Sequence, residues 1–104
     1  MMTADEPETG YRPTPLDVSR VTIPDDLMRI VEVLAENAHD VWAARRLAEG
    51  CRWGETQDPV AGTHPNLVRY ADLDEQAKDM DRAMALGNIS ALLALGYEIR
   101  RPEG

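Results

Sequence analysis

Three residues suited to ligand chemistry, His39, Trp42 and Arg46, follow one another at spacings of three and four. Such steps return to the same side of a helix, so these side chains form one stripe with Ala35 before them. The stripe flanks the apolar face of the predicted helix. A tryptophan and an arginine one turn apart can hold a flat ring and an anion, by stacking and by charge-assisted hydrogen bonds. The stripe therefore predicts a ligand site beside a helix core.

Structural alternatives stay open for the two central residues. Trp42 lies at the edge of the apolar face, where a tryptophan can simply belong to the core. Arg46 could form an ion pair with Glu49 or with Asp81 on a second helix. We prefer Asp81 as the partner, because a buried ion pair would fix the orientation of the guanidinium group.

The other candidate residues favour structural roles over catalysis. His39 and Asp40 are neighbours, and neighbours on a helix point about 100° apart, so they are not a dyad. We expect His39 and His64 to fix the central loop by hydrogen bonds. Cys51 and the two histidines lack the spacing of a zinc site, and no nucleophile has a recognisable base beside it. We therefore expect no metal, no cofactor and no catalytic residue.

Composition sets the class of the protein. The 104 residues are 43% apolar, contain no Phe, and carry a net charge of −8. A core of Ala, Leu, Val and Met favours helices. The negative charge argues against non-specific binding to nucleic acid or to acidic membranes. One cysteine excludes an internal disulfide, and no signal peptide or membrane-spanning run is visible, so we predict a soluble cytoplasmic protein.

Proline, glycine and apolar spacing divide the chain into an all-α arrangement with two long helices. The helices begin at aspartates that suit an N-cap, and they end at glycines. A loop of this length has a purpose in a compact domain, so it is expected to bind or to contain a short β-hairpin. The predicted segments are a frayed N-terminus (1–10), an extended proline-rich arm (11–24), a helix (25–50), a long loop (51–71), a helix (74–95) and a tail (99–104).

The apolar residues of each helix predict the core. On the second helix, one apolar stripe has no predicted neighbour, so the arm or a partner subunit must cover it. This unpartnered stripe consists of Leu86, Ile89 and Leu93. The core faces are predicted to be Leu27, Ile30, Val31, Leu34, Ala38, Val41 and Trp42 on the first helix, and Leu73, Ala77, Met80, Ala83, Met84, Gly87 and Ala91 on the second.

Five motifs in a fixed order cover residues 11–98 and together are specific. They are Tyr11-x-Pro13-x-Pro15-x-Asp17-x-Ser19-x-Val21-x-x-Pro24, Leu34-Ala-Glu-Asn-x-His39-Asp-x-Trp42-Ala-x-x-Arg46, His64-Pro-x-Leu-Val68-x-Tyr70, Asp81-Arg82 and Leu92-Leu-Ala-Leu-Gly-Tyr97. This order closely resembles the ryanodine receptor repeat, or RyR domain, in a stand-alone copy of the bacterial or phage type.

The resemblance implies two main antiparallel helices in one domain spanning 11–98, without channel activity because no pore is present. It also implies an adenine-nucleotide site, with a base on Trp42 and a phosphate or ribose near Arg46. The segment Gly50-Cys51-Arg52-Trp53-Gly54 departs from the family pattern Gly-Trp-x-Tyr-Gly, and Gly62 stands where a lysine is common. These departures weigh against a triphosphate more than against base stacking.

The predicted function is a non-enzymatic module that binds a nucleotide-like small ligand. Trp42 would stack on the ring and Arg46 would contact the anion, and His39 and Asp81 are further predicted residues of the ligand site. The arm and loop residues that could close over the ligand are Tyr11, Trp53, His64 and Tyr70. The alternative is a protein-interaction module with no small ligand, which forms a homodimer through Leu86, Ile89 and Leu93.

Overall fold

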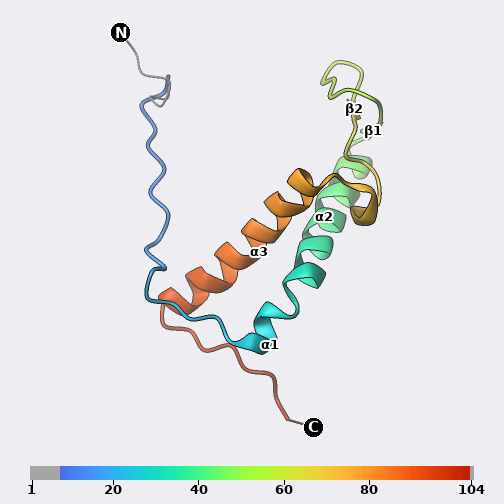
Figure 1. Cartoon of the computed structure of the whole chain (residues 1–104). Coiled ribbons are helices and arrows are strands. Elements are labelled where there is room, and N and C mark those ends of the chain that lie inside the picture. Colours follow the sequence, from blue (N-terminus) through green and yellow to red (C-terminus); the bar gives the residue numbers. More distant parts are fainter. Residues whose placement is uncertain (1–7, 104) are drawn as a thin grey trace.

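The computed structural model describes residues 8–103 and is mostly helical, as predicted. Two long helices run in opposite directions and cross, and a small paired element lies beyond the end of one of them (Figure 1). The elements in chain order are α1 (Asp25–Met28), α2 (Val31–Ala48), β1 (Arg52–Trp53), β2 (Thr63–His64), the 3-10 turn η1 (Tyr70–Asp72) and α3 (Glu75–Ala94). The expected frayed terminus falls largely on residues 1–7, which lie outside the described part.

The ends of α3 agree closely with the sequence. The Asp74 carboxylate accepts a hydrogen bond from the backbone N–H of Ala77 at 2.8 Å, which caps the first turn. At the other end Gly96 adopts a φ of 95°, and the N–H of Tyr97 bonds back to the carbonyl of Leu92. This left-handed glycine closes the helix because it has no Cβ to oppose that conformation.

The first predicted helix is in fact two. α1 ends at Met28 and α2 begins at Val31, with Ile30 as a non-helical cap at φ −101° and ψ 3°. The predicted aspartate cap is also wrong, because α1 begins after Pro24 and has no side-chain cap. No proline or glycine lies at the break, so the sequence held no signal for it.

The core agrees with the prediction only in part. Leu27, Val31 and Leu34 of the first helix and Leu73 and Ala77 of the second pack in the core as predicted, but α3 also buries another face. The α3 stripe that seemed unpartnered packs inward, since Ile89 is 6% exposed and forms a cluster with Val31 and Ala85. Leu86 and Leu93 pack against the same cluster, so the predicted dimer surface is occupied within the chain. The residues assigned to the core that are instead exposed are Ile30, Val41, Met80, Ala83, Met84 and Gly87.

A second buried cluster joins α2, η1 and the start of α3. Ala35 is fully buried against Tyr70 and Leu73, with Val68 and Ala77 packed around them. A residue with a single methyl group at position 35 lets the ring of Tyr70 come close to the helix. The two clusters together hold α2 and α3 at their crossing.

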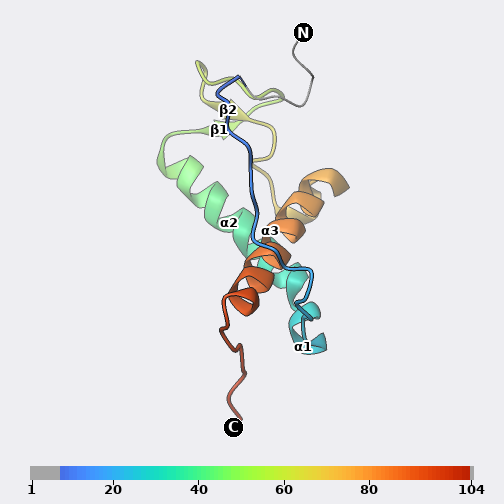
Figure 2. The same cartoon turned by 90° about the vertical axis from the view of Figure 1, so that its left-hand side faces the viewer.

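The N-terminal arm departs from the expected strap. Figures 1 and 2 show it extended alongside α3 and separated from it, and every residue from 8 to 20 is exposed. Packing begins only at Ile23, which contacts the cluster around Val31. At the other terminus Ile99 contacts the same cluster, although the sequence assigned it to a free tail.

The central loop contains a parallel pair of strands, not the expected hairpin. Arg52 pairs with Thr63 and Trp53 with His64, and an antiparallel bridge joins Asp58 to Thr63. A Cβ built on Gly54 would lie 2.6 Å from the Cβ of Thr63, so glycine alone permits this approach. The pairing places β2, and with it His64, beside the end of α2.

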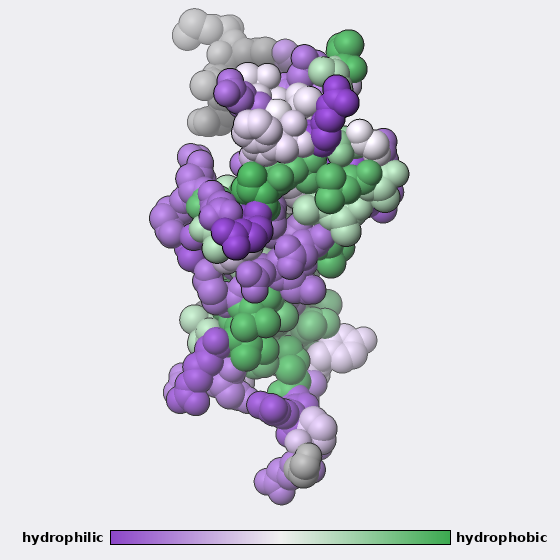
Figure 3. Space-filling model, turned by 90° about the vertical axis from the view of Figure 1, so that its right-hand side faces the viewer, coloured by the Kyte–Doolittle hydropathy of each residue, from purple (hydrophilic) through white to green (hydrophobic). Residues whose placement is uncertain are grey.

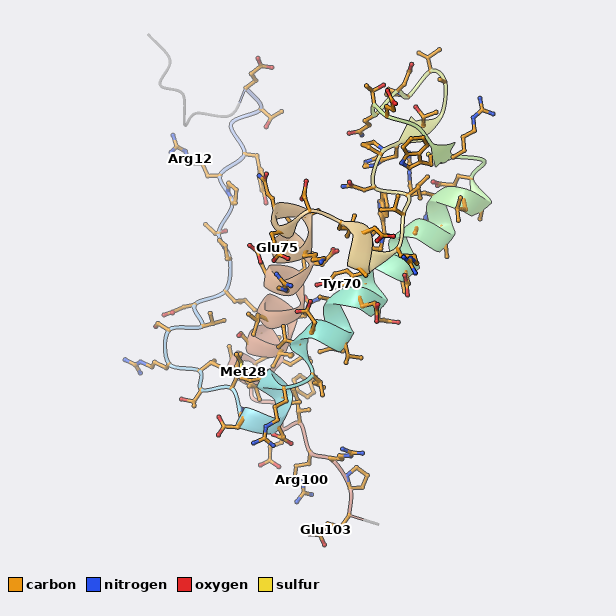
Figure 4. All side chains as sticks on the ribbon, turned by 45° about the vertical axis from the view of Figure 1, so that its right-hand side comes forward. Arg12, Met28, Tyr70, Glu75, Arg100 and Glu103 are labelled. Carbon is orange, nitrogen blue, oxygen red and sulfur yellow. The ribbon has the colours of Figure 1, made fainter. Side chains whose placement is uncertain are left out.

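Arg82 connects α3 to α2, because all three nitrogen atoms of its guanidinium group donate to carboxylates. Its Nε and Nη2 donate to the two carboxylate oxygens of Glu32 at 2.7 and 2.9 Å, and its Nη1 donates to Glu75 and Asp79. The Tyr70 hydroxyl donates to Glu32 as well, at 2.7 Å. Figure 4 shows Tyr70 at the turn η1 and Glu75 at the start of α3.

These contacts shift the protonation equilibria of the group. Hydrogen bonds from Arg82, then from Tyr70, lower the pKa of Glu32 from 4.5 to about 2. Desolvation, then the bond to Glu32, raises the pKa of Tyr70 from 10.0 to about 12. Glu32 therefore stabilises the fold fully above pH 4.5, and this stabilisation is lost as the pH falls through about 2.

Glu32→Gln tests this junction. The variant should melt below wild type at pH 7, because it removes the charge that Arg82 and Tyr70 share. The difference should shrink between pH 4.5 and pH 2, where Glu32 of the wild type becomes protonated. Thermal melts followed by circular dichroism across this range measure both effects. Glu36→Gln, an exposed change on the same helix, is the control; an equal loss in both variants would contradict the assignment.

Candidate functional site

His39 anchors the connection between the strands and α3. Its ring is buried at 4% exposure, and its Nε2 donates to the carbonyl oxygen of Val68 at 2.7 Å. Because a carbonyl can only accept, the proton must be on Nε2. The predicted loop contact of His39 is confirmed. Ala35 and His39 of the stripe are buried in the core, whereas Trp42 and Arg46 remain partly exposed.

His64 is fixed by its own loop, as expected. The backbone N–H of Asn66 donates to its Nδ1 at 3.0 Å, so the ring proton is on Nε2. Desolvation, and then the nearby charge of Arg46, lower the pKa of His64, which favours the neutral ring. Both histidines thus have one nitrogen committed to the loop.

Trp42 lies between the two histidines. Its ring meets His64 edge to face, with centroids 4.9 Å apart, and lies 5.6 Å from the ring of His39. These contacts fix the indole on α2 while leaving it partly exposed. Such edge-to-face pairs contribute about 0.5–1.5 kcal/mol beyond burial.

Two hollows meet at Trp42 and Asp81. One, the polar hollow, has a volume of about 300 Å³ and lies next to the loop. It is lined by His39, Trp42, His64, Asn66, Ala77, Met80 and Asp81. The other, the apolar groove, has a volume of about 550 Å³ and runs between α2 and α3. It is lined by Leu34, Asn37, Ala38, Trp42, Asp81, Met84, Ala85, Asn88, Ile89 and Leu92.

Arg46 does not belong to this pair of hollows. Its guanidinium donates to Glu49 at 3.3 Å and reaches the Cys51 sulfur at 3.8 Å. The preferred pair with Asp81 is therefore wrong and the Glu49 alternative is right. A short-range partner on the same helix costs little chain ordering, because Glu49 is only three residues away.

The predicted closing residues are not brought together. Tyr11 is 67% exposed on the arm, which lies on the far side of α3 from the strands, as its neighbour Arg12 shows in Figure 4. Tyr70 is buried next to the ring of His39 and donates a hydrogen bond to Glu32, so it supports the site without lining a hollow. Trp53 is 53% exposed on β1 and lines neither hollow. Of the four, only His64 lines a hollow.

Several lining residues were missed from the sequence. Met84, Asn88 and Leu92 follow Asp81 at helical spacing, and Asn37 precedes Trp42 by five residues on α2. The α3 spacing was visible, but the stripe was assigned to the wrong side of the helix. Asn66 comes from the loop, where spacing carries no comparable signal.

The arrangement suits binding through an aromatic surface and polar edges. Within residues 8–103 no group of three or more His, Cys, Asp or Glu side chains is placed to hold a metal ion. Cys51 is a buried free thiol whose sulfur contacts Arg46. What the hollows offer is one indole, amide groups and one carboxylate.

His39→Phe tests the loop anchor. The variant keeps a ring of similar shape and leaves the Val68 carbonyl without its donor, which should lower the free energy of unfolding by about 1–3 kcal/mol. Urea denaturation measures this loss. Val41→Ala, at a 62% exposed position of α2, should change stability by less than about 0.5 kcal/mol. Equal stability of His39→Phe and wild type would contradict the anchoring role.

Comparison with known families places these features in context. None of the helices in the described part is long and apolar enough to cross a membrane. The model of the RyR domain family matches residues 11–101. The match spans the arm, both long helices and the loop that carries His64, which is the whole framework around Trp42. The chain therefore belongs to the RyR domain family.

Proposed function

We propose that this protein is a non-enzymatic binding module that holds the ring of a nucleotide-like small molecule against Trp42. The observation that carries the proposal is that one partly exposed indole lines both hollows while two histidines fix it. Volumes of about 300 and 550 Å³ fall within or near the range of small-ligand sites, about 300–1,000 Å³.

The polar groups around Trp42 suit the edge of a base or a ribose. Asn37 and Asn88 reach the apolar groove from opposite helices, and Asn66 reaches the polar hollow from the loop. Each amide offers two donors and an acceptor, so it can match a heterocycle that presents both. The Nε2–H of His64 supplies one further donor in the polar hollow.

Arg46 can serve the proposed ligand only outside the hollows. A phosphate would have to extend past the loop and replace Glu49 at the guanidinium group. Since that ion pair is partly exposed, it is weak and could be exchanged. Base binding is thus favoured over phosphate binding, in line with the altered segment at residues 50–54.

A binding role without catalysis fits the state of the histidines. His39 and His64 each use one ring nitrogen in a loop contact, and in the described part of the chain neither ring forms a hydrogen bond to Asp81. The unprotonated Nδ1 of His64 already accepts a hydrogen bond from Asn66, and the unprotonated Nδ1 of His39 belongs to a ring that is only 4% exposed, so neither suits a general base. We include the absence of enzymatic activity as part of the proposal.

A second candidate is a protein-interaction module, favoured by exposed apolar side chains. Met84, Leu92 and Val41 are 61%, 44% and 62% exposed. Figure 3 shows apolar areas on the α2 side, separated by a hydrophilic band. Exposed apolar area of this kind marks contact sites in many soluble proteins. Light scattering of wild type and Met84→Glu should show a change of mass if these side chains join two copies.

Trp42→Leu tests the proposed ligand site, with Trp53→Leu as the matched control. Adenosine at ten times its dissociation constant should stabilise wild type by about 1.4 kcal/mol. In a domain of this size, that corresponds to a rise of about 6–11 °C in the melting temperature. Trp42→Leu should lose the rise, and Trp53→Leu should keep it. Thermal shift with adenosine and ATP measures both, and a rise that survives Trp42→Leu would contradict the proposal.

A further inference from the structure

Asp81 is a carboxylate without a partner at the point where the two hollows meet. It is partly buried on α3 and lines both of them. Within the described chain, no hydrogen bond or ion pair is formed by its side chain. Among the residues that line the hollows, it is the one Asp, Glu, Lys or Arg.

The nearby cations are already engaged elsewhere. Arg82 follows Asp81 directly, but its guanidinium group is turned to Glu32, Glu75 and Asp79. Lys78 lies 3.7 Å from Glu75 and over the ring of Tyr70. Arg46 is paired with Glu49. No cation of the described chain therefore neutralises the carboxylate of Asp81.

Trp42 and Asp81 together form a pair of groups that attracts a cation. The face of an indole attracts a positive charge through its quadrupole, and the attraction grows when water is excluded. A carboxylate in the same hollow adds a charge of the correct sign. Met80 and Met84 flank the two hollows with polarisable, adaptable side chains. An anionic group would instead meet the charge of Asp81 and the net charge of −8.

We propose that the preferred ligand of this site is an organic cation, a flat heteroaromatic ring that carries its positive charge in the ring or on an attached amine. The ring lies on Trp42 and its charge faces Asp81. This inference rests on the proposed binding of a ring at Trp42 and specifies the charge of that ring. It distinguishes the site from one that selects a ligand by its phosphates.

The test compares two probes of nearly equal shape, 1-methylnicotinamide, a permanent cation, and nicotinamide, which is neutral. Titrations followed by the indole N–H resonance of Trp42 in ¹⁵N-labelled protein give both affinities. The cation should bind about tenfold more tightly to wild type. Its affinity should fall as sodium chloride is raised from 50 to 500 mM, whereas that of nicotinamide should not.

Asp81→Asn should reduce the ratio of the two affinities to about one. The substitution preserves the size of a side chain that has no hydrogen bond to lose, so the fold should be kept. Asp40→Asn removes the same charge at an exposed position of α2 that lines neither hollow, and it should keep the tenfold ratio.

The outcomes separate this inference from the proposed function. A wild-type ratio near one, or a ratio unchanged by Asp81→Asn, overturns the inference. Binding of ATP tighter than that of adenosine and of 1-methylnicotinamide also overturns it, while ring binding at Trp42 stands. If neither probe nor adenosine shifts the Trp42 resonance at millimolar concentration, the proposed ring site itself is wrong. If Asp81→Asn fails to fold, Asp81→Ser takes its place in the same comparison with Asp40→Asn.

Discussion

The contact between Arg82 and Glu32 is the constraint on which the arrangement of the two long helices depends. A guanidinium group that meets a carboxylate with two parallel hydrogen bonds fixes both distance and orientation. Tyr70 adds a third bond to the same carboxylate, so the junction also includes the turn that leads into α3. The apolar clusters supply the attraction between the helices, and this polar contact adds a fixed distance and orientation between α2 and α3. The junction lies on the side of the helix crossing where the loop ends at Tyr70.

The loop follows from that junction. Because Tyr70 is bonded to Glu32, the nearby Val68 lies where His39 can donate to its carbonyl oxygen. The loop before Val68 runs past the end of α2. The parallel pairing of Arg52 and Trp53 with Thr63 and His64 then fixes the position of His64 at the edge of the polar hollow. Gly54 permits this close approach. Trp42 consequently lies between two histidines that are each held by a hydrogen bond to the loop, and a positioned aromatic surface is what a binding site for a ring requires.

The charged residues of α3 lie on two different faces of the helix. Arg82 and Lys78 form ion pairs on the face of α3 that contacts Glu32 and Tyr70, while Asp81 lines the hollows. Two neighbouring residues of opposite charge thus serve opposite faces, because successive positions on a helix point about 100° apart. The face that holds the helices together carries Arg82 and Lys78 against three carboxylates, whereas Asp81 is the one Asp, Glu, Lys or Arg side chain that lines the hollows.

The sequence by itself determined the helical class, the limits of α3, the loop roles of His39 and His64, and the family. These depend on local spacing, caps and glycines, and on ordered motifs, all of which are readable along one chain. It also pointed to Trp42 as the residue to examine. Which apolar stripe of α3 is buried was decided only by the tertiary structure, because α3 is apolar on two sides and the composition of each stripe is similar. The partner of Arg46 was decided in the same way, since Glu49 and Asp81 were equally available until α3 was placed. Trp42 and Asp81 were both predicted site residues, but only the packing of α2 against α3 decided that they line the same two hollows.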